Sequence, residues 1–256
     1  MTAGGAVPIR NDLALPDQGH LLAALDALAA ESDPVRRCLA GVDSGQFRHP
    51  DGRTDRFDGV ALTRHQLALV MHLSGRCPTP LTIETGFGLG TSASIIMGTR
   101  DQRREAFEHI AFDPWGLPSN SGAVVESYLM ERFGPRFRLL RVRSEIGLGQ
   151  LIGERGTALV GLAHIDGCHH FENVMTDFVL ADLLCAVGGF IVMHDANYAA
   201  IQTAIRYIDG NRPDYAIAHL AVPNMTVLQI RGNDKAEWDA FTPFAVPGRR
   251  DWTPVD

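Results

Sequence analysis

The densest group of polar side chains that could do chemistry lies in the stretch AHIDGCHHFENV. Asp166 ends an apolar run of strand length, and His169 and His170 follow within four residues. A second pair, His194 and Asp195, ends the next apolar run, GFIVMHD. Open α/β sheets bind ligands outside the carboxyl ends of their strands. We therefore expect Asp166, His169, His194 and Asp195 to face one small volume.

Two kinds of chemistry suit this group. Two carboxylates and an imidazole can hold a divalent ion, which clamps an alcohol or enol oxygen and favours its deprotonation. A free histidine nearby can take a proton near neutral pH. The alternative is that His170 and His194 only satisfy backbone groups at the strand ends. Asp166 fits that alternative less well.

A second candidate site is the glycine turn TIETGFGLGTS. Glu84 ends a strand-like run, and Gly86, Gly88 and Gly90 precede a helix that should begin near Thr91. Glycine lets the backbone approach a ligand where side chains would collide. The dinucleotide fingerprint G-x-G-x-x-G rests a pyrophosphate on the helix N-terminus, whereas this turn reads G-x-G-x-G behind a carboxylate. The charge favours a cationic ligand end, such as the ammonium of S-adenosylmethionine, over NAD; a tight turn without a ligand is the other interpretation.

Two more strand ends offer ligand contacts. Asp113, in HIAFDPWG, is placed to accept both ribose hydroxyls of a nucleoside, although it can also cap a turn before Pro114. Ser144 follows the next strand and is placed to meet an adenine, although serine at a strand end is also an ordinary surface residue.

The elements that position these residues follow from the hydrophobic pattern. From Pro80 onward, apolar runs of strand length alternate with helical stretches, which indicates βαβ units and a parallel sheet. Two last runs are separated only by Pro223-Asn224, which favours an antiparallel pair at the sheet edge. We predict a Rossmann-like doubly wound α/β sheet, mostly parallel, with an antiparallel edge hairpin and helices on both faces. The expected parallel strands are Leu81–Thr85, His109–Asp113, Phe137–Val142, Leu159–Asp166 and Gly189–Asp195, and the expected helices include His20–Ala30, Leu62–Leu73, Ala123–Phe133, Phe171–Ala186 and Tyr198–Ile208.

Taken together, these stretches resemble the class I S-adenosylmethionine-dependent methyltransferases. The resemblance is to the small-molecule O-methyltransferases that include macrocin-type sugar O-methyltransferases, and more distantly to catechol O-methyltransferase. It rests on TIETGFGLGTS, HIAFDPW, the run from His164 to Asp195, and YAAIQTAIRYI. These pieces cover about half of the chain and are more specific together than a glycine triplet alone.

The resemblance implies roles for the polar cluster. In such sugar methyltransferases, an aspartate at the position of Asp166 and an acidic pair 28 and 29 residues later bind magnesium, and this spacing falls on His194 and Asp195. A histidine three places after the first aspartate is the proposed general base, which makes that residue His169. His194 departs from the family, and imidazole suits a transition metal better than Mg²⁺. The metal, Mg²⁺ or a transition metal, and the dependence on it stay open.

The resemblance further implies methyl transfer from S-adenosylmethionine to a small-molecule acceptor, at a hydroxyl oxygen of a sugar or another natural-product intermediate. Two alternatives stay open. One is an NAD-dependent Rossmann oxidoreductase with Asp113 on the ribose. The other is a non-catalytic binding subunit with a methyltransferase fold, because a fold does not dictate a function.

Composition indicates which classes of partner the protein should not have. The net charge of −7 comes without a basic run, so we expect no nucleic-acid partner. No stretch approaches the run of about 20 apolar residues that spans a bilayer, so we expect no membrane partner. Four cysteines without CxxC spacing indicate reduced thiols and a cytoplasmic protein. The apolar helix near residues 21–30 suggests a homo-oligomer.

We also expect three parts along the chain. Residues 1–79 form an N-terminal arm and helical cap, 80–232 form the core, and 233–256 form a C-terminal extension. Acceptor specificity is expected to lie in loops and in the cap.

Overall fold

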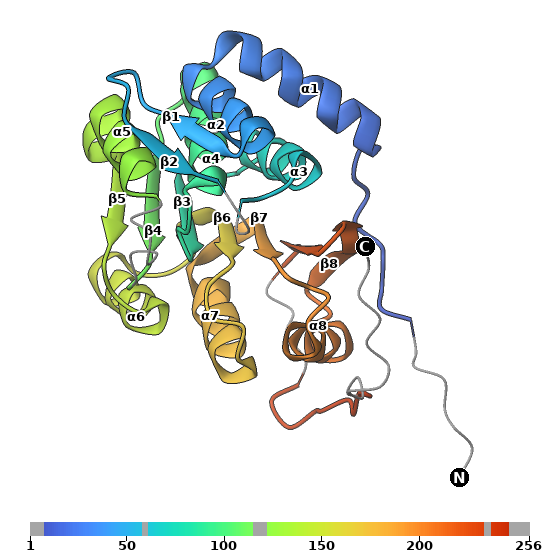
Figure 1. The fold of residues 1–256 in the computed structure, drawn as a ribbon. Helices are drawn as coiled ribbons and strands as arrows, with labels where there is room; N and C mark the ends of the chain where they lie inside the picture. Colours follow the sequence, from blue (N-terminus) through green and yellow to red (C-terminus); the bar gives the residue numbers. More distant parts are fainter. Residues whose placement is uncertain (1–7, 58–60, 115–121, 233–236, 246–256) are drawn as a thin grey trace.

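A seven-stranded sheet forms the centre of the protein. The computed structural model describes residues 8–57, 61–114, 122–232 and 237–245 (Figure 1). The strands lie in the order β5-β4-β3-β6-β7-β9-β8. The first five are parallel, and β9 runs antiparallel to both of its neighbours. Their bounds are β3 Leu81–Thr85, β4 Glu108–Phe112, β5 Phe137–Leu140, β6 Val160–Ile165, β7 Cys185–Met193, β8 Tyr215–Val222 and β9 Met225–Ile230. The predicted fold, with its antiparallel edge hairpin, is confirmed.

Helices cover both faces of the sheet (Figure 1). This explains why every residue of β3 and β6 is buried, on both faces of each strand. One face packs against α6, α7 and α8, and the other against α3, α4 and α5. The helices are α3 Arg64–Ser74, α4 Thr91–Gln102, α5 Ala123–Phe133, α6 Ser144–Arg155, α7 Phe171–Leu184 and α8 Ala199–Asn211, with a 3-10 turn η1 at Gly134–Arg136.

The N-terminal segment lies over the second face rather than apart from it. It contains α1 (Gln18–Glu31), α2 (Asp33–Ser44) and a small hairpin of β1 (Gln46–Arg48) and β2 (Thr54–Arg56). Residues of α1 and α2 share one hydrophobic core with α3, α4 and the sheet. The division at residues 79 and 232 stays a prediction, and most of 233–256 lies outside the described residues. No helix in the described ranges has both the length and the apolar character to cross a bilayer.

Two boundaries differ from the prediction. The helix expected over His20–Ala30 is α1, which ends at Glu31, but a second helix that was not predicted, α2, follows at once with Pro34 in its first turn, where the missing proline N–H costs nothing. The helix expected over Phe171–Ala186 ends at Leu184, and β7 begins at once at Cys185. The strand continues across an irregularity in its pairing with β6 near Gly188, whose φ is +85°. No polar residue separates the end of α7 from the start of β7.

Candidate active site

The glycine turn follows β3 directly and precedes α4. Gly86, Gly88 and Gly90 all have positive φ, at +84°, +50° and +65°, a backbone conformation that favours glycine. A Cβ added at Gly86 would overlap the carbonyl oxygen of Asp166, whereas a Cβ at Gly88 would meet no atom of the described residues within 4 Å. The turn therefore contacts the end of β6 at Gly86, whereas Gly88 has space beside its Cα.

Asp113 holds this turn in shape. Its Oδ2 accepts hydrogen bonds from the backbone N–H groups of Phe87 and Gly88, at 3.0 and 3.1 Å. The side chain comes from the end of the neighbouring strand β4, and the residue is 9% exposed. The expected capping role exists, but the turn that Asp113 caps is the glycine turn and not the one at Pro114. Ribose binding by the same carboxylate stays a prediction.

Glu84 lies fully buried beneath the turn. Its Oε2 accepts a hydrogen bond from the Ser92 hydroxyl at 2.5 Å, and its Oε1 lies 3.4 Å from Nε2 of His109 without a hydrogen bond. The other ring nitrogen of His109 lies 2.9 Å from the Thr82 hydroxyl. The Glu84 carboxyl group thus lies beneath the turn, where a cationic ligand end was expected, although it has no exposed surface. The sequence did not point to Ser92 or His109. A contact between side chains on different elements leaves no recognisable pattern of spacing along the chain.

Thr91 and Ser144 both begin helices near the turn. The Thr91 hydroxyl oxygen accepts a hydrogen bond from the Leu62 N–H at 3.4 Å, and its side chain faces the segment before α3. Ser144 lies beside the buried Asp177 carboxyl together with Thr85. Burial raises the pKa of Asp177, and the two hydroxyls oppose that rise. Adenine binding by Ser144 stays a prediction.

The ends of β6 and β7 bring the four expected polar side chains together. Oδ1 of Asp166 lies 2.9 Å from Nδ1 of His194, and the same nitrogen lies 3.4 Å from Oδ2 of Asp195. Nε2 of His169 lies 3.0 Å from that Asp195 oxygen. Asp195 therefore sits between two imidazoles. His170 points outward, with 76% of its side chain exposed.

Asp195 has an unusual backbone. Its φ is +49°, which is rare for residues other than glycine and is tolerated best by asparagine and aspartate. The following N–H of Ala196 bonds to the Asn224 carbonyl in the β8–β9 turn, at 3.0 Å. The edge hairpin thus helps to hold the aspartate against both histidines, as strained residues at functional sites often are.

The charges of the cluster follow from these contacts. Burial alone would lower the pKa of His194, but hydrogen bonds to Asp166 and Asp195 outweigh it and raise the pKa to about 10. The hydrogen bond to Asp195 raises the pKa of His169, with burial opposing it. Burial would raise the pKa of Asp195, yet the two histidines hold it well below its usual range. His194 is therefore cationic at neutral pH, and Asp195 is anionic.

His169 has the geometry of a general base. Its side chain is 42% exposed, so a ligand can reach it. Because Nε2 faces the carboxylate, Nδ1 is the nitrogen left to accept a proton. Its ring lies 5.3 Å from that of Tyr198, and His169 borders a small pocket at the ends of β6 and β7.

A metal ion would find a suitable donor set in the same place. Ligand atoms of Asp166, His169 and Asp195 all lie within 4.8 Å of one another. This set has the composition expected from the sequence, two carboxylates and one imidazole, but with His169 in the place of His194. His194 contacts both carboxylates, and its role as a ligand stays a prediction.

Comparison with known proteins agrees with this geometry. Residues 83–196 match a family model described as a methyltransferase domain. That range begins in β3 and includes the glycine turn, Asp113 and the Asp166 cluster through Asp195. A search of curated proteins found no match.

Solved structures share the fold at low identity. A Podospora anserina methyltransferase, PaMTH1, with bound S-adenosylhomocysteine is 17% identical, with a TM-score of 0.55 over 86% of this chain and 99% of that one. CalS11, a TDP-rhamnose 3'-O-methyltransferase of calicheamicin biosynthesis, is 13% identical, with a TM-score of 0.55 over 86% and 96%. A Corynebacterium glutamicum protein is 17% identical, with a TM-score of 0.54 over 86% and 93%.

The matched domain indicates a methyltransferase, and the fold is the one that the solved methyltransferase structures share. The protein carries a methyltransferase domain over residues 83–196, and its sheet order places the glycine turn and the polar cluster at one edge. The predicted enzyme class and family resemblance are confirmed.

Proposed function

We propose that this enzyme transfers the methyl group of S-adenosylmethionine to a hydroxyl oxygen of a small molecule, such as a sugar or another natural-product intermediate. The observation that carries the proposal is the contact between Gly86 of the glycine turn and the Asp166 carbonyl. Because of this contact, the glycine turn proposed for the methyl donor lies directly beside the Asp166 cluster proposed for proton transfer. Methyl transfer needs donor and acceptor held at bonding distance, which is the main contribution a protein can make to this reaction.

The glycine turn fits the proposed methyl donor. Gly88 opens onto free space, so its backbone can approach a ligand closely. The Glu84 carboxyl group lies beneath the turn and suits a cationic ligand end, while Asp113 and Ser144 are the candidates for the ribose and the adenine. When bound, S-adenosylmethionine supplies an electrophilic methyl group on a sulfonium. The PaMTH1 structure holds the demethylated form of this cofactor in the same fold.

His169 carries the proton chemistry in this proposal. Asp195 accepts the Nε2 hydrogen of the neutral imidazole and thereby leaves Nδ1 to take the proton of the acceptor hydroxyl. The same carboxylate stabilises the imidazolium that results. The His194 imidazolium and Asp166 keep the corner polar and ordered beside the reacting oxygen.

The cluster can also hold a divalent metal. Asp166, Asp195 and His169 supply oxygen and nitrogen donors, a mixture that suits a transition metal better than Mg²⁺. A bound ion would lower the pKa of the acceptor hydroxyl. A metal-bound His169 cannot also accept the proton, so metal assistance and base catalysis by this residue are separable proposals.

The test begins with the cofactor. Calorimetric titration with S-adenosylhomocysteine and with NAD should show binding of the first only. Labelled S-adenosylmethionine is then offered with hydroxylated sugar nucleotides and with catechols, and methylated product is collected before and after treatment with EDTA and readdition of Mg²⁺ or Mn²⁺. Binding of NAD instead would overturn the proposal. Binding of the nucleoside without methylation of any hydroxyl acceptor would instead favour a binding subunit.

We also propose a cellular setting and a state of assembly for the enzyme. Cys38, Cys77, Cys168 and Cys185 are all unpaired, which supports a reducing, cytoplasmic setting. Leu21 and Leu25 of the expected contact helix are buried within the chain. Val179, Leu183 and Val187 are exposed instead, near the end of α7 and the start of β7, and support self-association there. Light scattering on the purified enzyme decides between a monomer and a homo-oligomer.

A further inference from the structure

Helix α5 begins against the glycine turn with a residue that cannot cap it. Gly122 has φ +88°, and a Cβ at this position would overlap the carbonyl oxygen of Gly88. Only glycine therefore fits at the N-cap of this helix. Because glycine has no side chain, the first N–H groups of α5 receive no cap from the N-cap residue itself.

A carboxylate from the N-terminal hairpin supplies the missing cap. Oδ2 of Asp55, in β2, accepts hydrogen bonds from the N–H groups of Val124 and Val125, at 2.9 and 3.3 Å. These are the second and third residues of α5, the positions that an N-cap side chain normally serves. Asp55 is 7% exposed, so both bonds are shielded from water.

The capped residues are those that border the proposed cofactor turn. Val125 is fully buried, and its Cγ1 is among the atoms that a Cβ at Gly90 would meet, at 2.9 Å. Gly122 rests on Gly88 from the same helix end. Asp55 thus holds a helix end that packs against two of the three glycines.

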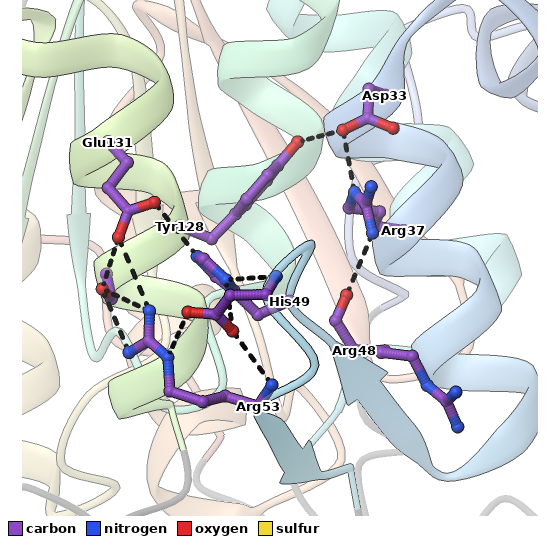
Figure 2. A network of polar contacts seen from close by, with 9 residues as sticks. Asp33, Arg37, Arg48, His49, Arg53, Tyr128 and Glu131 are labelled. Carbon is purple, nitrogen blue, oxygen red and sulfur yellow. Dashed lines mark hydrogen bonds and ion pairs between the residues drawn. The ribbon is translucent and has the colours of Figure 1, made fainter.

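Further polar contacts fix the hairpin to the side of α5 (Figure 2). The Arg53 guanidinium donates hydrogen bonds to the Ser127 hydroxyl at 3.4 Å, and Nε2 of His49 lies 3.3 Å from a Glu131 carboxylate oxygen. His49 itself is almost completely buried. Asp55 is therefore delivered from a hairpin that is attached along the helix, and not from a free loop.

We infer that Asp55 is a positioning residue of the methyl-donor site. It acts at a distance, by fixing the first turn of α5 so that Gly122 and Val125 hold the glycine turn in the shape that accepts the nucleoside. This inference rests on the proposed function, because it assigns Asp55 to the binding of S-adenosylmethionine and its product. A carboxylate that only stabilised the fold would leave that binding unchanged.

Calorimetry with S-adenosylhomocysteine tests the assignment on the full chain. Asp55→Ala should weaken binding by about fivefold or more, the factor that corresponds to the loss of one helix cap. Asp55→Asn keeps an acceptor oxygen and should recover most of that affinity. The matched control is Asp17→Ala, since Asp17 caps a different helix, α1, by accepting a hydrogen bond from the His20 N–H at 3.0 Å. The control should bind as the wild type does.

Hydrogen exchange on the wild-type protein gives a second measurement, in case Asp55→Ala does not fold. Addition of S-adenosylhomocysteine should slow exchange of the Val124 and Val125 amides. Unchanged exchange there, or an Asp55→Ala protein that melts earlier yet binds the nucleoside normally, would overturn the inference alone. A wild-type protein that does not bind the nucleoside would overturn the proposed function as well.

Discussion

At the scale of single residues, Asp195 decides which atoms can react. It lies between two imidazoles, and its left-handed backbone is held by the neighbouring hairpin. One imidazole, His194, is only 14% exposed and is cationic, and the other, His169, is 42% exposed. The two histidines therefore have different tasks, the first to keep the carboxylates in place and the second to exchange a proton with a ligand.

Replacement of His169 should affect the rate and spare the cofactor. His169→Ala removes the base, and kcat should fall by about 10² to 10⁴-fold, the usual contribution of a positioned base. Affinity for S-adenosylhomocysteine should stay within about twofold, because the residue lies on the acceptor side of the turn. Steady-state kinetics and calorimetry on the same preparation measure both. His170→Ala, on an outward-pointing neighbour, is the control and should behave as the wild type.

The dependence of the rate on pH tests the pair more directly. His169 must be neutral to accept a proton, and its contact with Asp195 raises its pKa above the ordinary value of about 6.5. The rate should therefore rise with pH and level off above that value. In Asp195→Asn the midpoint should move down toward 6.5 while the plateau falls. A midpoint that is identical in both proteins would show that a different group limits the reaction.

The composition of the polar cluster could be predicted from the residues at the ends of the expected strands. Asp166, His169, His194 and Asp195 meet because adjacent parallel strands end at one edge, a rule that needs only the strand order. The division of labour between the two histidines could not be predicted in this way. It depends on burial and on which nitrogen faces which oxygen, and neither leaves a trace in sequence spacing.

At the scale of elements, the glycine turn has three positions with different reasons for glycine. All three have positive φ, but only Gly88 has free space where a side chain would be. Gly86 abuts the Asp166 backbone, and Gly90 packs against the Phe87 ring and Val125. The sequence motif shows three equal glycines, so this difference is visible only in the structure.

Alanine at these positions should separate binding from stability. Gly88→Ala should cost only about 1 kcal/mol of folding free energy, for its backbone conformation, yet lower the affinity for S-adenosylhomocysteine by at least about tenfold. Gly86→Ala should lower the free energy of unfolding by about 3 kcal/mol, because its Cβ meets backbone that cannot move aside. Urea denaturation and calorimetry measure the two quantities. Gly149→Ala, on α6 with open space around it, is the control and should leave binding unchanged.

The elements themselves were predictable to different degrees. The buried parallel strands appear as short segments rich in apolar residues, so β3, β4 and β6 were predicted within a residue or two of their bounds. The hairpin β1–β2 was not, since each strand has three residues and one buried side chain. Its tie to α5 through Asp55 joins residues 69 and 70 positions apart, which no local pattern can reveal.

At the scale of the whole molecule, the choice of cofactor depends on which acceptors the backbone N–H groups of the glycine turn already bond to. A pyrophosphate needs free N–H groups at the helix N-terminus. Here the N–H groups of Phe87 and Gly88 already donate to the Asp113 carboxylate, and the buried Glu84 carboxylate lies beneath. A pyrophosphate at this point would find these two N–H groups already occupied and two carboxyl groups close by, whereas a sulfonium nucleoside with an ammonium end does not need the N–H groups.

Ligand-induced stabilisation follows from this difference. A ligand that binds only the folded chain raises the free energy of unfolding by about 2.7 kcal/mol when present at 100 times its Kd. For a chain of this size that corresponds to roughly 5 to 10 °C in Tm. S-adenosylhomocysteine should produce such a rise, and the rise should grow with concentration, whereas NAD at the same concentrations should leave the Tm where it is. Because Asp113→Asn weakens the carboxylate that occupies the turn, it should reduce the response to the nucleoside without creating one to NAD. A response to NAD in the wild type would mean that the turn rearranges to release its amides, and the charge argument for a methyl donor would fail.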